Sequence, residues 1–84
     1  MRIKCTKNAA EDIAYWKTKD KKIYKRFCIL MHDIEKNPFK GLGKPEALKY
    51  NLKGKWSRRL TQEHRVVYEV FEDFVIIHQC RFHY

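Results

Sequence analysis

Long apolar runs are missing from this sequence, and their absence excludes whole classes of protein. No hydrophobic stretch approaches the roughly 20 residues that a membrane-spanning helix requires, which excludes a transmembrane protein. The first five residues also lack the apolar stretch of a signal peptide. We therefore expect a cytoplasmic protein that does not associate with a membrane.

Cysteine is also scarce, and its placement argues against metal and disulfide chemistry. Cys5, Cys28 and Cys80 are odd in number, lie far apart and form no C-x-x-C pair. A zinc site, a redox motif and a disulfide framework therefore lack support, and we expect three small core residues. The glycines near Lys44 do not match the spacing of a phosphate-binding loop. We expect neither a metal nor another cofactor.

Acidic residues are few relative to basic ones. The chain holds 19 lysines and arginines against 10 aspartates and glutamates, a net charge of +9. Residues 37–67 alone carry eight basic and two acidic side chains, so most of the net charge lies in the middle of the chain. This excess favours a polyanionic partner, either nucleic acid or an acidic protein. A membrane surface would also attract the charge, but it is the weakest candidate because the strongest amphipathic helix is needed for the core.

Two helices are predicted in the first half of the chain. Asn8 is a suitable N-cap for a helix that ends near Lys19. Asp20 is a suitable N-cap for a second helix, whose apolar side chains recur with helical spacing as far as Ile34. This helix should end near Asn37, because Pro38 disfavours helical geometry in the residue before it. Both prolines and two of the three glycines lie in residues 37–47, which predicts a surface loop.

From residue 48 onward the apolar period changes to two, which predicts strands. The expected strands span residues 55–61, 65–71 and 75–83, with a short first strand at residues 1–5. An 84-residue chain fits one domain, spanning residues 1–84. We predict an α+β fold in which an antiparallel sheet carries both helices on one face.

Strand parity predicts a cationic face on this sheet. Even-numbered positions are mostly apolar and should face the helices, whereas Arg59, Arg65, Arg81 and His83 share the other face. A three-residue turn at 72–74 would place Arg65 opposite Arg81. Such a cluster suits a phosphodiester backbone with a stacked base.

Several residues have a simpler interpretation when they are considered singly. Arg58 and Arg59 are typical of solvated strand residues. His78 falls on the apolar face, where a hydrogen-bonded core or edge histidine is expected, and His64 is a loop residue with no evident partner.

Four motifs, in this order and spacing, resemble the YoeB toxins of the RelE/ParE toxin–antitoxin superfamily. They are GKPEALK at 43–49, WSRR at 56–59, EHRVVY at 63–68 and CRFHY at 80–84. The resemblance spans nearly the whole chain. It implies a RelE-like fold and a ribosome-dependent mRNA endonuclease that contacts ribosomal RNA. It further implies neutralisation by a YefM-like antitoxin, and a homodimer is a further expectation.

The resemblance also implies roles for six residues. Glu46 corresponds to the general base, His83 to the general acid and Arg65 to the residue that binds the scissile phosphate. Lys49 and Arg59 would contribute to the cationic site, and Tyr84 would position the nucleotide. RNA supplies its own 2′-hydroxyl nucleophile, so this chemistry requires no metal.

Two other functions remain open on the sequence. A non-catalytic RNA- or ribosome-binding domain would use the same cations and aromatic residues, but Glu46 would be dispensable. A ParE-like gyrase poison on the same fold would not need the pair Glu46 and His83.

Overall fold

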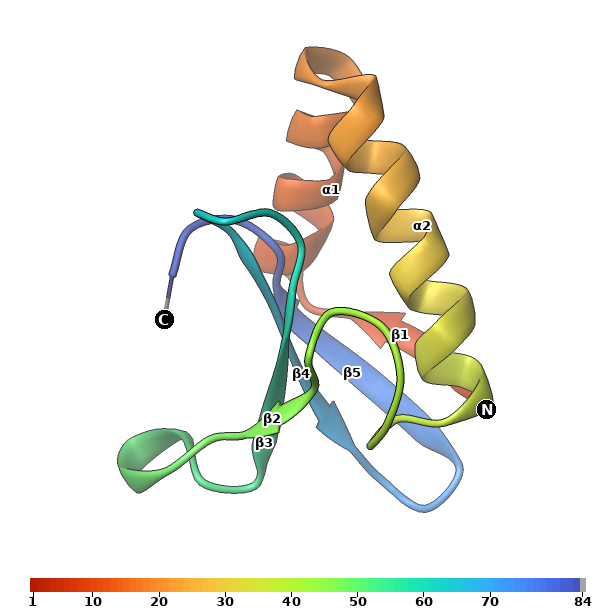
Figure 1. The fold of residues 1–84 in the computed structure, drawn as a ribbon, viewed down its shortest axis with the longest axis vertical. Helices are drawn as coiled ribbons and strands as arrows, with labels where there is room; N and C mark the ends of the chain where they lie inside the picture. Colours follow the sequence, from red (N-terminus) through yellow and green to blue (C-terminus); the bar gives the residue numbers. More distant parts are fainter. Residues whose placement is uncertain (84) are drawn as a thin grey trace.

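The computed structural model describes residues 1–83, which form two helices and a five-stranded sheet (Figure 1). In chain order the elements are β1 (Arg2–Cys5), α1 (Lys7–Lys19), α2 (Lys21–Lys36), β2 (Glu46–Ala47), the 3-10 helix η1 (Tyr50–Leu52), β3 (Lys55–Arg59), β4 (Arg65–Val70) and β5 (Phe74–Gln79). No helix within residues 1–83 is long and apolar enough to cross a bilayer.

Side-chain caps set the helix boundaries. The prediction that α1 begins at Asn8 is wrong, because the Thr6 hydroxyl accepts a hydrogen bond from the Ala9 N–H and begins the helix two residues earlier. That hydroxyl also donates to the carbonyl of His78, which joins the helix start to β5. Asp20 caps α2 as predicted, and α2 ends at Lys36 with Asn37 as its C-cap, which agrees with the predicted end near Asn37. Asp20 alone separates the two helices.

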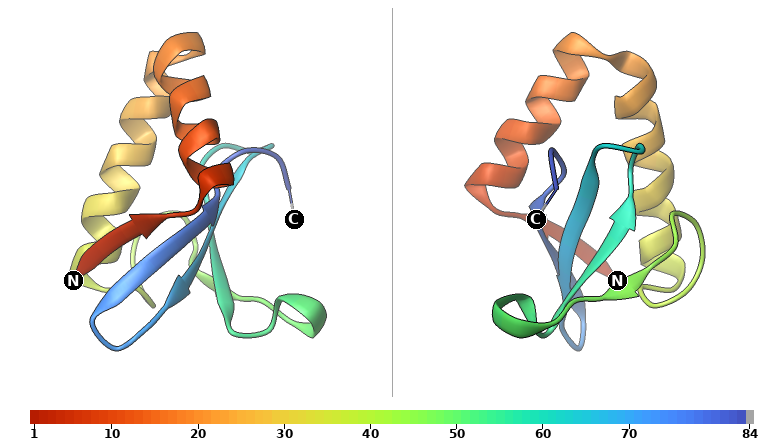
Figure 2. Two further views of the ribbon diagram at one scale, coloured as in Figure 1. Left: turned by 180° about the vertical axis from the view of Figure 1, so that it is seen from behind. Right: turned by 60° about the vertical axis from the view of Figure 1, so that its left-hand side comes forward.

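The strand order is β1-β5-β4-β3-β2, with every pair antiparallel except β1 and β5. The sheet is therefore mixed, and the expectation of an antiparallel sheet is wrong at this edge. Figure 2 shows β1 lying along β5, so the first and last strands are neighbours in space. Both helices lie on one side of the sheet, as predicted, and their apolar faces pack on its core side.

The core lies between the helices and the sheet. Its buried side chains come mainly from α1, α2, β4 and β5, and include Trp16, Phe27, Leu30, Ile34, Val66, Tyr68, Val75 and Ile77. The Trp16 indole N–H donates to the Cys80 carbonyl over 2.8 Å. Cys80 is buried as predicted, and burial raises the pKa of its thiol to about 12. Cys5 is exposed, so the prediction of three core cysteines is wrong at that position.

The register of the last hairpin differs from the prediction. Val70 pairs with Val75, and the Phe71 N–H donates to the Phe74 carbonyl. The turn between β4 and β5 therefore contains two residues, 72 and 73, whereas three, 72–74, were predicted. The parity of β5 is consequently reversed, and Ile77 faces the core. A bulge opposite Val67 and Tyr68, in which His78 of β5 has no pairing partner, then shifts the register back by one residue.

The end of β5 also differs from the prediction. β5 ends at Gln79, and Arg81 lies beyond it with its guanidinium stacked 3.5 Å from the Tyr15 ring centroid. Arg81 is therefore not among the residues that line the cationic cavity described below. His78 forms the predicted hydrogen bond, with Glu69 over 3.0 Å, but the reversed parity removes it from the apolar face.

Arg58 has the most unexpected environment on β3. It is fully buried on the side of the helices, as strand parity predicts for an even-numbered position, whereas taken singly it was expected to be a solvated strand residue. It forms an ion pair with Asp33 of α2. A hydrogen bond from the Leu42 N–H, together with the Arg58 guanidinium, holds the pKa of Asp33 below its ordinary value of 3.8. Burying a charge is unfavourable unless it is paired, so Asp33 and Arg58 depend on each other.

This pairing predicts a specific dependence of stability on acid. A carboxyl whose pKa is lower in the folded state stabilises the protein above its unfolded-state pKa, and this stabilisation disappears as the pH falls through the folded-state pKa. We expect the free energy of unfolding to fall more steeply below pH 3.8 in the wild type than in Asp33→Asn. Urea unfolding at a series of pH values would measure both slopes. Equal slopes would contradict this assignment, and Glu35→Gln on the same helix is the control.

Candidate active site

A small polar cavity opens on the face of the sheet that is turned away from the helices. It has a volume of about 140 Å³. Its lining residues come from the loop before β2, from β2, β3 and β4, and from the segment after β5: Lys44, Glu46, Ser57, Arg59, Arg65 and His83. Four of the six residues singled out in the sequence therefore meet in one cavity.

Strand pairing places three of these four side chains on one face. Glu46 on β2 is the register partner of Ser57 on β3, and Arg59, two residues further along, is the partner of Arg65 on β4. Directly paired residues point to the same face, and so do residues two apart on one strand. The Arg59 N–H also donates to the carbonyl of Gly43 over 2.7 Å, which holds the chain just before Lys44 against β3.

The Arg65 guanidinium is fixed by the turn that precedes β4. Its Nη1 donates to the carbonyls of Thr61, Gln62 and His64 over 2.8, 3.1 and 3.1 Å. The Thr61 hydroxyl in turn accepts hydrogen bonds from the N–H groups of Glu63 and His64. Arg65 is half-buried and Arg59 is exposed, and both cations line the same cavity.

His83 reaches the cavity although it lies beyond the last strand. Phe82 holds this segment across β4, because its carbonyl accepts from the Arg65 N–H and its own N–H donates to Nδ1 of His64 over 2.7 Å. The Gln79 side chain also donates to the His83 carbonyl over 3.4 Å. The bulge at His78 of β5 restores the register that brings this segment opposite Arg65.

His64 was expected to have no partner, and that prediction is wrong. Its ring packs edge-on against Trp16, with the centroids 4.7 Å apart, and its Nδ1 accepts the Phe82 N–H. An accepting Nδ1 places the ring proton on Nε2 in the neutral form. His64 therefore links the segment that contains His83 to Trp16 of α1. Its position next to Arg65 is the only signal in the sequence for this role.

Lys49 lies next to this cavity but does not line it. It lines a larger adjoining hollow of about 650 Å³, formed by residues 46–52, and Glu46 belongs to both. Tyr50 lines the same hollow, is 90% exposed and has a positive φ of 57°. Figure 1 shows that the loop after β2 projects from the sheet. Sequence reasoning missed Tyr50, and also Lys44 and Ser57. Tyr84, the sixth predicted residue, lies outside the described residues.

The arrangement suits a phosphate group with a proton acceptor beside it. Lys44, Arg59 and Arg65 are cationic, and Glu46 is the one carboxylate among the six lining residues. Clustered cations attract anions, and an arginine matches the geometry of a phosphate. Within residues 1–83, no group of three or more histidine, cysteine, aspartate or glutamate side chains could hold a metal ion.

Comparison with known proteins identifies the family. Residues 5–84 match the family described as the YoeB-like toxin of bacterial type II toxin–antitoxin systems. The chain belongs to this family. The YoeB toxin of Escherichia coli K12 is 46% identical over 84 residues, which span the full length of both chains. The resemblance drawn from the four sequence motifs is thereby confirmed.

Solved structures of YoeB toxins have the same fold. A YoeB/ParE toxin from Agrobacterium tumefaciens superposes with a TM-score of 0.97 at 40% identity, over all of both chains. YoeB from Staphylococcus aureus has been solved as a dimer, with a TM-score of 0.92, and in a heterotetrameric complex with YefM, with a TM-score of 0.91. Each is 41% identical, and each match covers 100% of this chain and 98% of the other. The α+β, RelE-like fold predicted for this YoeB-family chain is therefore confirmed.

Proposed function

We propose that this YoeB-family toxin is an mRNA endonuclease that acts on the ribosome and cleaves RNA by attack of its own 2′-hydroxyl group. The observation that carries the proposal is the cavity that Glu46, Arg59, Arg65 and His83 share. A phosphodiester with a neighbouring hydroxyl needs a base, cations and an acid around one phosphorus atom, and these four residues supply them.

Each side chain has one step in this mechanism. Glu46 accepts the proton of the 2′-hydroxyl, whose oxygen then bonds to phosphorus. Arg65, with Arg59, stabilises the negative charge that develops on the phosphate oxygens. The bond from phosphorus to the 5′-oxygen breaks, and protonated His83 donates a proton to that oxygen. The products are a 2′,3′-cyclic phosphate, which water can open to a 3′-phosphate, and a 5′-hydroxyl.

The adjoining hollow would hold the RNA beside the cleaved bond. Lys49 would contact a phosphate there, and the exposed ring of Tyr50 would stack on a neighbouring base. Tyr84 would position the nucleotide, as the family resemblance implies. Lysines on the helices would contact ribosomal RNA, and such contacts make binding weaken steeply as the salt concentration rises.

Mapping mRNA ends on programmed ribosomes tests this function. Purified protein should cut ribosome-bound mRNA, leave free mRNA largely intact and produce 5′-hydroxyl ends. A 5′-phosphate end would refute attack by the 2′-hydroxyl. Intact mRNA with translation still blocked would instead indicate a non-catalytic ribosome-binding domain, and a DNA-damage response without translational arrest would indicate a gyrase poison.

The stacking role of Tyr50 gives a separate prediction. Each stacked base contributes about 1–3 kcal/mol to binding, so Tyr50→Ala should raise KM for ribosome-bound mRNA by roughly 5- to 150-fold with little change in kcat. Tyr50→Phe keeps the ring and should remain near the wild type. Initial rates at a series of programmed-ribosome concentrations would separate the two constants. Equal KM values for the alanine variant and the wild type would exclude stacking.

Two protein partners follow from the same proposal. A YefM-like antitoxin would cover the cationic cavity with an acidic segment, and a second copy of the chain would form a homodimer. YoeB of Staphylococcus aureus forms both kinds of assembly. Light scattering after size-exclusion chromatography, with and without the antitoxin, would establish the assemblies. An mRNA substrate on the ribosome also implies that the toxin acts in the cytoplasm.

A further inference from the structure

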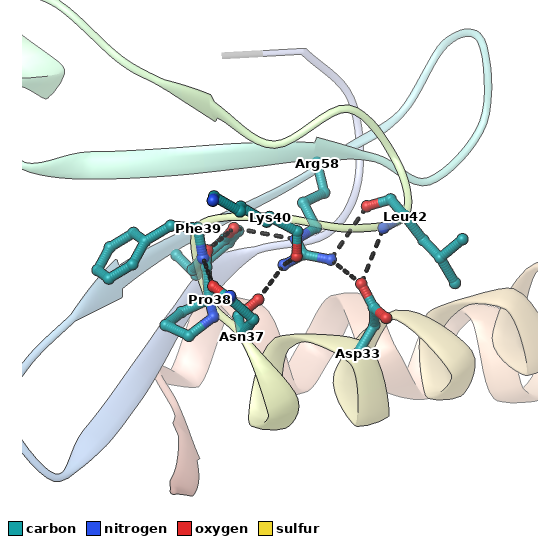
Figure 3. Close-up of polar contacts among 8 residues, drawn as sticks. Asp33, Asn37, Pro38, Phe39, Lys40, Leu42 and Arg58 are labelled. Atoms are coloured by element: carbon teal, nitrogen blue, oxygen red, sulfur yellow. Dashed lines mark hydrogen bonds and ion pairs between the residues drawn. The ribbon is translucent and has the colours of Figure 1, made fainter.

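Arg58 uses its whole guanidinium group to hold one loop. An arginine side chain has five N–H donors. Here Nε donates to the Tyr68 hydroxyl, Nη1 to Asp33 and to the Leu42 carbonyl, and Nη2 to the carbonyls of Asn37 and Lys40. Figure 3 shows the guanidinium surrounded by these acceptors from α2 and the following loop. We define this group of contacts, Arg58 with Asp33, Tyr68 and the 37–42 loop, as the arginine clamp.

The other members of the clamp are also joined to one another. The carboxylate of Asp33 accepts the Leu42 N–H over 2.8 Å, and the Tyr68 hydroxyl donates to the Pro38 carbonyl over 2.6 Å. Burial raises the pKa of Tyr68, so its hydroxyl keeps the proton that it donates. Residues 37–42 belong to no helix or strand, so their carbonyls receive donors from the side chains of Arg58 and Tyr68 and not from a backbone ladder. Arg58 therefore supplies the hydrogen-bond donors that a helix or sheet would otherwise supply to the 37–42 loop.

This loop leads directly into the cavity. Only three residues, Gly43, Lys44 and Pro45, separate Leu42 from Glu46. On β3, Arg58 stands between Ser57 and Arg59, which point to the opposite face and line the cavity. One side of the strand thus carries the clamp and the other side carries the cavity wall.

A purely structural role would not require this choice of residue. Burying a charge is costly, and an apolar side chain of similar volume often stabilises a core equally well or better. An apolar residue at position 58, however, would leave the carbonyls of Asn37, Lys40 and Leu42 without these donors. The clamp therefore serves the placement of the loop better than it serves general stability.

We propose that Arg58, with Asp33 as its counter-ion, is a positioning residue that sets the distance between Glu46 and the Arg59–Arg65 pair. This inference rests on the proposed nuclease function. The clamp fixes the loop before β2 to the strand that carries Arg59, so loosening it moves the base relative to the phosphate-binding cations. Small displacements of a catalytic group lower the rate of the chemical step more than they lower substrate binding.

Asp33→Asn tests the proposal, with Arg58→Lys as a second variant that keeps the charge but has donors on one nitrogen only. We expect kcat on programmed ribosomes to fall at least about tenfold, with KM within about twofold of the wild type. Amide hydrogen exchange should become faster at Leu42 and Arg59 and stay unchanged at Ile77. Glu35→Gln, an exposed acid on the same helix, and Ile77→Val, which weakens the core alone, should both keep the wild-type kcat.

The possible outcomes distinguish a failure of the positioning role from a failure of the proposed nuclease function. Faster exchange at Leu42 and Arg59 with an unchanged kcat would show a clamp without a positioning role and would overturn the proposal. Unchanged exchange at both amides would overturn it as well, even if the rate fell. A wild type that cleaves no mRNA would refute the nuclease function and with it the positioning role, while the exchange data would still decide whether the clamp holds the loop.

Discussion

Replacing Glu46 by glutamine should lower the single-turnover rate of mRNA cleavage on the ribosome by about 10²- to 10⁴-fold, the usual contribution of a positioned general base. Glutamine keeps the size of the side chain and its capacity for hydrogen bonding, but it cannot accept the 2′-hydroxyl proton. The two arginines proposed to bind the phosphate, Arg59 and Arg65, are left intact. The loss should therefore appear in the chemical step, with binding to the ribosome retained.

The matched control is Glu11→Gln, which removes an exposed carboxylate from α1 and should leave the rate unchanged. His83→Ala should cause a loss of similar size, because the leaving 5′-oxygen would then lack its proton donor. If Glu46→Gln cleaved at the wild-type rate under saturating ribosome concentrations, the carboxylate would have no role as a base. The cavity would then be a binding site alone.

The second large effect is expected at Gly41, where alanine should destabilise the fold by about 3 kcal/mol or more. Gly41 has a φ of +125°, and a Cβ added there would collide with the carboxylate of Asp33. Asp33 would have to move away from Arg58, and breaking a buried ion pair from one side costs about 3–5 kcal/mol. Thermal unfolding should show a fall in Tm of more than about 10 °C, as expected for a domain of this size.

Gly54 offers a control for backbone strain alone. Its φ is +95°, but a Cβ added there would meet no atom within 4 Å. Gly54→Ala should therefore cost only the conformational penalty, about 1–2 kcal/mol. If the two alanine variants lost equal stability, the collision with Asp33 would be unimportant and the 37–42 loop would tolerate displacement. A larger loss at Gly41 would be an independent sign that the clamp is rigid.

The helices and strands were predictable because their signals are local. The apolar spacing of α2, its cap at Asp20 and its end before Pro38 all lie within the element itself. The start of α1 was wrong by two residues, since both Thr6 and Asn8 are suitable caps and only the contact with β5 favours Thr6. The parallel pairing of β1 with β5 depends on the whole topology, and no local pattern specifies it.

The cavity was only partly predictable, for a similar reason. Parity and the family motifs together indicated Glu46, Arg59, Arg65 and His83, and the structure brings these four together. Alternation alone would have failed for the last strand, because the two-residue turn and the bulge at His78 of β5 each shift the register by one residue and so compensate. Arg58 and His64 were misjudged because their partners, Asp33 and Trp16, come from distant helices.

The pairing of β1 with β5 also has a consequence for how the chain folds. β1 can pair only after β5 has been made, so the loop that closes when the two strands pair includes nearly the entire chain. Closing so long a loop carries an entropic cost, and non-local pairings of this kind slow folding. During synthesis the apolar faces of α1 and α2 are complete long before β4 and β5 can cover them. We infer that a growing chain has no assembled cavity until β5 has been made, because Arg65 and His83 take their places only as the sheet closes.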